Sequence, residues 1–75
     1  MEIIKESKRG NYEKVKALIE NKAELETKDK TERTALNNAS LEGHKEVVKL
    51  LIENKAELET KDNSGRTPIL CIIEN

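Results

Sequence analysis

The sequence predicts an all-α repeat protein, in which helix-turn-helix units stack on one another and are joined by short β-hairpin-like fingers. The strongest observation is that residues 19–29, IENKAELETKD, recur unchanged as residues 52–62, at a spacing of 33 positions. The match extends back to two glycines, since 16 of 20 positions are identical when residues 10–29 are aligned with residues 43–62. A fixed period of this length is typical of repeat arrays, in which each unit is one supersecondary element.

Apolar residues at helical spacing predict two helices in the middle unit, over residues 35–42 and 45–54. Thr34 stands where an N-cap belongs, because its hydroxyl can accept a hydrogen bond from a free backbone N–H of the first turn. Gly43 can adopt the left-handed conformation that ends the first of these helices. The middle unit is therefore expected to fold as helix, tight turn and helix.

Each second helix is followed by a short stretch that favours an extended chain and a turn. After residues 56–62 comes Asn-Ser-Gly-Arg, whose residue types favour tight turns, so the segment should project as a finger. Thr67 and Pro68 then repeat the helix-start signal, because proline at the first helical position loses no needed donor. A coiled coil is the competing interpretation of so charged a chain, but Gly43, Gly65 and Pro68 interrupt any heptad pattern.

The composition limits both the core and the range of partners. In 75 residues, 35% are hydrophobic and 39% charged, and Tyr12 is the one aromatic, so the core should be small and aliphatic. The 14 basic and 15 acidic residues are interleaved, which leaves no basic stripe for a nucleic acid. The apolar runs are too short for membrane insertion, and the charged start lacks a secretory signal. We expect a cytoplasmic protein, with the nucleus as the alternative location.

The sequence contains no pattern that supports catalysis. His44 has neither a carboxylate nor a nucleophile at a suggestive spacing, and it stands in a turn that opens a helix. Cys71 lies in an Ile/Leu run and is interpreted as a small buried hydrophobic residue; the single thiol forms no metal cluster with the single histidine. Glycine-rich phosphate loops and Ser/His/Asp sets are absent from the sequence. We therefore expect no enzymatic activity, no catalytic residues, no cofactor and no metal.

The middle unit resembles one complete ankyrin repeat through residues 29–36 (DKTERTAL), Ala39, Gly43, His44, 46–52 (EVVKLLI) and Ala56. The period of 33 residues supports this resemblance, which covers essentially the whole chain, whereas tetratricopeptide repeats are longer and richer in aromatic residues. The resemblance implies an ankyrin-repeat solenoid of about two and a third repeats. Residues 1–28 would form an N-terminal capping-type partial repeat, 29–61 a complete repeat, and 62–75 a truncated third repeat with a finger and the start of its first helix.

The resemblance also implies a non-enzymatic module that binds another protein through the finger tips and the exposed, concave side of the first helices. Carried over by position, the implied contact residues are Lys30, Thr31, Arg33, Leu41, Glu42, Asn63, Ser64 and Arg66.

Several residues depart from the family pattern. Glu32 replaces the turn glycine that is kept at Gly65, at a cost of about 1 kcal/mol if the backbone there needs a positive φ. Asn37 replaces a usual histidine, so side-chain hydrogen bonds between neighbouring fingers are expected to be weaker. The glycine that normally follows the second helix is also replaced, by Lys22 and Lys55, with Asn21 and Asn54 beside them as candidates for the left-handed conformation.

The two ends of the chain differ in character. In the first unit Glu6 replaces Ala39 and Lys14 replaces Val47, so a face that is apolar in the middle unit is charged, as a terminal repeat with a solvent-facing side requires. The opposite end carries an apolar run, for which we expect stacking or self-association through Ile69, Leu70, Ile72 and Ile73. The alternative function is thus an assembly element, or a fragment of a longer array, that stacks through this end.

Overall fold

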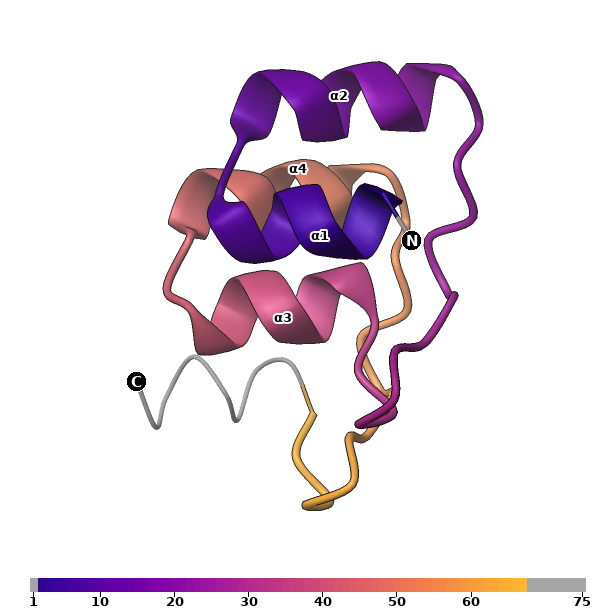
Figure 1. Ribbon diagram of the computed structural model, residues 1–75, viewed down its shortest axis with the longest axis vertical. Coiled ribbons are helices and arrows are strands. Elements are labelled where there is room, and N and C mark those ends of the chain that lie inside the picture. Colours follow the sequence, from indigo (N-terminus) through magenta and orange to yellow (C-terminus); the bar gives the residue numbers. More distant parts are fainter. Residues whose placement is uncertain (1, 68–75) are drawn as a thin grey trace.

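The computed structural model describes residues 2–67 and shows four helices arranged as two pairs (Figure 1). The first pair is α1, Glu2–Arg9, with α2, Tyr12–Glu20, and the second is α3, Ala35–Leu41, with α4, Lys45–Glu53. Within each pair the two helices pack together, and between the pairs α1 packs against α3 and α2 against α4. Residues 2–67 contain no strand. The predicted all-α repeat fold is confirmed.

The predicted signals at the ends of α3 are confirmed. The Thr34 hydroxyl accepts a hydrogen bond from Asn37 N at 3.3 Å, while Asn37 Oδ1 accepts one from Thr34 N at 3.0 Å, and together they form a capping box. Such caps contribute about 1 kcal/mol to helix stability. Gly43 has the expected positive φ, 77°. Both helices of the middle unit end one residue earlier than predicted, because Glu42 and Asn54 are C-caps.

All four helices contribute to one aliphatic core. Its buried members are Ile3, Ile4, Val15, Ala35, Leu36, Ala39, Val47, Val48, Leu50, Leu51 and Ala56. Burying a Val, Leu or Ile side chain contributes about 1.5 to 3 kcal/mol, so packing of one unit on the next is the main source of stability.

The prediction for the ends of the second helices was wrong. Lys22 and Lys55 themselves adopt the left-handed conformation, with φ of 63° and 66°, whereas Asn21 and Asn54 do not. The reason is the pattern of hydrogen bonds that closes the helix. Ala23 N donates to Leu18 O at 2.9 Å, and this bond requires positive φ at the residue after the C-cap, whatever its type. Asn54 instead caps the helix with its side chain, because its Nδ2 donates to Leu50 O at 2.9 Å.

The prediction of a charged N-terminal face was wrong at Glu6 and confirmed at Lys14, which is exposed. Glu6 is only 2% exposed, and its carboxylate lies 3.7 Å from the Arg9 guanidinium. The equivalent residue of the middle unit, Ala39, is fully buried as well, so the position is an interior one in both units. The other oxygen of Glu6, Oε1, is buried and has no hydrogen-bond partner among residues 2–67.

Candidate functional site

Asp29 organises the first finger. Its Oδ1 accepts hydrogen bonds from Thr31 N at 2.8 Å, Arg33 N at 3.0 Å and Thr31 Oγ1 at 2.7 Å, and its Oδ2 accepts one from Asn38 Nδ2 at 3.1 Å. Burial alone would raise the pKa of Asp29, but these hydrogen bonds outweigh it and lower the pKa to about 2. Glu32 closes the turn with φ of 64°, the conformation anticipated for a replaced glycine. The first finger is therefore a preformed turn around an ionised carboxylate.

Asp62 has the same role in the second finger, with two arginines added. Its Oδ1 accepts from Ser64 N at 2.8 Å and Arg66 N at 3.0 Å. Its Oδ2 lies 3.2 Å from Arg33 Nε and 3.4 Å from an Arg66 guanidinium nitrogen. Burial would raise the pKa of Asp62, but the Arg66, Arg33 and Ser64 hydrogen bonds and the charge of Arg66 lower it. Each finger is thus held by its leading aspartate.

The two fingers are tied directly to each other. Arg33 of the first finger donates to the Asp62 carboxylate of the second, and Asn63 N donates to Thr31 O at 3.1 Å. Asn37, which replaces the usual histidine, still links helix and finger, because its Nδ2 donates to Thr60 O at 3.2 Å. Figure 1 shows both connecting segments descending on the same side of the helices, with their turns close together. These contacts hold the finger tips at one fixed spacing.

The predicted contact residues fall into groups with different surroundings. Lys30, Thr31, Asn63 and Ser64 are exposed at the two tips. Arg33 and Arg66 are more enclosed, with side chains only 22% and 24% exposed, because both bind Asp62. At the end of the first helix, Glu42 is exposed and Leu41 partly buried.

The first helices of the two units expose different amounts of surface. Every residue of α3 from Ala35 to Ser40 is buried, so α3 contributes only its last residue, Leu41. In α1, Lys8 and Arg9 occupy the places of Leu41 and Glu42 one period earlier, and both are exposed. These two cations were not among the predicted contact residues, although the 33-residue alignment places them at the positions of Leu41 and Glu42.

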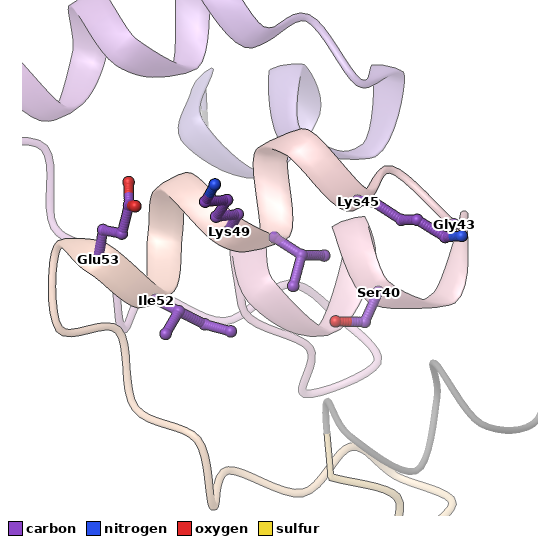
Figure 2. A pocket seen from close by; sticks show the side chains of 7 residues that line it. Ser40, Gly43, Lys45, Lys49, Ile52 and Glu53 are labelled. Atoms are coloured by element: carbon purple, nitrogen blue, oxygen red, sulfur yellow. The ribbon is translucent and has the colours of Figure 1, made fainter.

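A pocket of about 600 Å³ lies on α4 and the turn before it (Figure 2). It is lined by Ser40, Gly43, Lys45, Val48, Lys49, Ile52 and Glu53. None of the eight predicted contact residues belongs to it. The sequence signal that could have found it is Ile52, which stands at helical spacing from Val48 on the outer face of α4.

Residues 2–67 contain neither a membrane-spanning helix nor a cluster of metal-ligating side chains. None of the four helices is long and apolar enough to cross a membrane. In the same part of the chain, His, Cys, Asp and Glu side chains do not gather in threes in a way that could hold a metal ion.

Two stacked helix pairs with hydrogen-bonded finger turns define a helical repeat protein of the kind that presents loops on a rigid scaffold. The family model for ankyrin repeats (3 copies) matches residues 3–75, so the chain belongs to the ankyrin repeat family. A search of curated proteins finds no match to the chain. Ankyrin repeats generally act as protein–protein interaction modules and are generally not enzymes.

Proposed function

We propose that this chain binds a partner protein through its two finger tips and the adjoining ends of α1 and α3. The observation that carries the proposal is that Lys30, Asn63 and Ser64 are exposed on turns whose shape is already set by Asp29 and Asp62. A turn whose backbone is already ordered loses little backbone entropy on binding, so more of the contact energy becomes affinity.

In this proposal the eight residues have two roles. Lys30, Thr31, Asn63 and Ser64 contact the partner at the tips, and Leu41 and Glu42 extend the surface towards the helices. Arg33 and Arg66 belong to the same surface, but their binding to Asp62 also positions the tips. A variant that removes either arginine therefore alters the finger as well as the surface.

The experiment compares capture of partner proteins by two triple variants of the tagged chain from an extract of its source cells. The finger variant carries Lys30→Ala, Asn63→Ala and Ser64→Ala and leaves both arginines unchanged. The control carries Glu13→Ala, Lys16→Ala and Glu20→Ala, three exposed positions on α2. Circular dichroism should show both variants folded. We expect the finger variant alone to lose the captured protein; retention of that protein by the finger variant would contradict the proposal.

The assembly alternative stays a prediction, because Ile69, Leu70, Ile72 and Ile73 lie outside the described residues. It is tested by light scattering of the chain and of Ile69→Lys and Ile72→Lys, each of which should abolish self-association while finger-mediated capture is kept. The division into residues 1–28, 29–61 and 62–75 and the intracellular location are likewise part of the proposal, supported by the 33-residue period and by the family.

A further inference from the structure

Charge is distributed unevenly between the fingers and the rest of the chain. Residues 28–33 and 61–66, the two finger turns, carry five cations and three carboxylates, a net charge of +2. The remainder of the chain carries nine basic and twelve acidic residues, a net charge of −3, which gives the whole chain its net charge of −1. The finger turns are thus a cationic region on a weakly acidic protein.

The three carboxylates of the finger turns are satisfied within the chain. Asp29 and Asp62 accept the hydrogen bonds that shape their turns, and the Asp62 side chain is only 1% exposed. The Glu32 carboxylate lies 3.8 Å from Lys28 Nζ, and both of these side chains are about half-exposed. The acids of the turns therefore contribute little net negative charge to the surface that a partner meets.

The exposed side chains of the turns are mainly hydrogen-bond donors. Lys30 and Lys61 are exposed, one on each turn. Asn63 and Ser64 add an exposed amide and hydroxyl, both of which can donate to a carboxylate. The hydrogen bond from Asn63 N to Thr31 O, at 3.1 Å, joins the two turns, so these donors belong to one surface.

Two guanidinium groups share the single carboxylate of Asp62. Its Oδ2 lies 3.2 Å from Arg33 Nε and 3.4 Å from Arg66 Nη2, so one positive charge is left unbalanced. Arg33 makes this contact through Nε, and the edge formed by its two terminal nitrogens has the geometry that binds a carboxylate through two hydrogen bonds. The Arg33 side chain is 22% exposed, so a partner can reach it, and its partial enclosure reduces the screening of its charge by water. A second carboxylate placed there would balance the two arginines.

We propose that the partner presents a short acidic segment to the finger turns, in which one carboxylate binds Arg33 and others bind Lys30 and Lys61. This chemistry rests on the proposed function, because it describes the partner of the same surface. Opposite charges also steer the encounter of two proteins, so binding should weaken as added salt screens them.

The segments that lead to the turns favour a short acidic segment over a long polyanion. Glu24, Glu26, Glu57 and Glu59 are exposed on these segments. Glu57 N donates to Glu26 Oε2 at 2.8 Å, so the two segments lie side by side. A nucleic acid strand that extended from the turns along the fingers would meet these like charges, which oppose binding. A protein segment can instead place its acids at the turns alone.

The test uses a defined peptide and the full chain. An end-blocked decapeptide of alternating glutamate and glycine is titrated into the ¹⁵N-labelled chain at low salt, and the control peptide has glutamine in place of every glutamate. We expect saturable NMR shifts at the amides of Lys30 and Asn63 and at the Arg33 Nε–H with the glutamate peptide. Its dissociation constant should be on the order of 1 mM. The glutamine peptide should bind about tenfold more weakly, because it keeps the shape and lacks the charge.

Two pairs of substitutions separate the site from the net charge of the chain. Lys30→Gln with Lys61→Gln removes two cations from the turns, and Lys16→Gln with Lys49→Gln removes two cations from α2 and α4. All four side chains are exposed, so the fold should remain. The first pair should weaken binding of the glutamate peptide about fivefold, and the second pair should leave it unchanged. Equal binding of the two peptides, or equal losses in the two pairs, would overturn the proposal.

Two other occupants are outcomes of the same titration. Tighter binding of a thymidine decanucleotide than of the glutamate peptide would overturn the proposal in favour of a phosphate backbone. Shifts at the turns that depend on the concentration of the chain alone would also overturn it, because the acidic segments of a second copy would then be the occupant. The proposed function fails separately: capture from the extract that depends on Lys30, Asn63 and Ser64, without any preference for glutamate, would overturn the acidic partner alone.

Discussion

The duplicated segments 19–29 and 52–62 have one sequence and two environments. Their backbones agree closely, with φ of 63° at Lys22 and 66° at Lys55. Their local hydrogen bonds agree too, since Glu26 N donates to Glu24 Oε1 at 3.1 Å and Glu59 N to Glu57 Oε1 at 3.2 Å. Burial, by contrast, differs, because only the first segment has a complete unit packed on it among the described residues. Local sequence thus determines the conformation, and the neighbouring unit determines how much surface is buried.

The largest effect is expected where a neighbouring unit leaves no room. Gly10→Ala should destabilise the chain by about 3 kcal/mol, because the new methyl group meets the His44 ring at a residue that already has φ of +76°. Gly65→Ala is the matched control and should cost about 1 kcal/mol. Its φ is also +76°, and within residues 2–67 no heavy atom other than those of its chain neighbours lies within 4 Å of an added Cβ. Urea unfolding measures both. Equal losses would mean that the neighbouring ring moves aside freely.

The aspartates that begin the two fingers differ in their partners. The Asp62 carboxylate binds two charged guanidinium groups, whereas the Asp29 carboxylate accepts hydrogen bonds from uncharged groups. Asp62→Asn should cost about 2 kcal/mol, because the Arg33 and Arg66 guanidinium groups lose their shared anion. Asp29→Asn removes a charge whose partners are N–H and O–H groups, so a loss of about 1 kcal/mol is expected. Thermal unfolding at neutral pH should rank the variants in this order.

The dependence of stability on pH provides an independent test of the role of these carboxylates. The folded-state pKa of both aspartates is lowered, so the stability they contribute is fully present above their usual pKa of 3.8. For Asp29 it is lost as the pH falls from 3.8 towards the folded-state pKa of about 2. The thermal midpoint of the wild type should therefore fall more steeply across this range than that of Asp29→Asn. Parallel curves would show that this carboxylate does not stabilise the fold.

Ile19 and Ile52 begin the two identical segments, so they test most directly how burial by a neighbouring unit affects stability. Ile19→Ala should cost about 2 kcal/mol, because that side chain packs against the core, whereas Ile52→Ala should cost less than about 1 kcal/mol at 43% exposure. Both variants can be measured in one set of urea curves. If the two losses were the same, burial by the neighbouring unit would not be the difference between the segments.

The sequence predicted features that depend on neighbouring residues along the chain. The helices of the middle unit, the Thr34 cap, the left-handed Gly43 and the finger turns all follow from patterns a few residues long. Contacts across units were not predictable in the same way. The Arg33–Asp62 pair joins residues 29 positions apart, and the pocket at Ile52 depends on which unit is packed where. Glu6 was placed on the surface because a charge usually lies there, but packing of the helix pairs buries it.

Glu6 of α1 and Ala39 of α3 occupy equivalent buried positions, so they extend the comparison of the two units to the first helices. Glu6→Met should stabilise the chain by about 1 kcal/mol, because a buried carboxylate with an unpartnered oxygen is replaced by an apolar side chain of similar size. Glu13→Met, at an exposed position on α2, is the control and should change stability little. Thermal unfolding distinguishes the two. Destabilisation by Glu6→Met would show that the ion pair with Arg9 outweighs the burial of its charge.

The smallest effect concerns the backbone shared by both copies. Lys22 and Lys55 hold a left-handed conformation that costs a non-glycine residue about 1 kcal/mol. Glycine would remove this cost, but it would also add entropy to the unfolded chain. Each Lys→Gly change should therefore stabilise the fold by about 0.5 kcal/mol. Lys49→Gly inside α4 is the control and should destabilise by about 1 kcal/mol. The two gains should be equal, since the same hydrogen bonds impose the same φ on both lysines. Unequal gains would mean that the neighbouring unit also acts on the backbone, and conformation and burial would then no longer be separable.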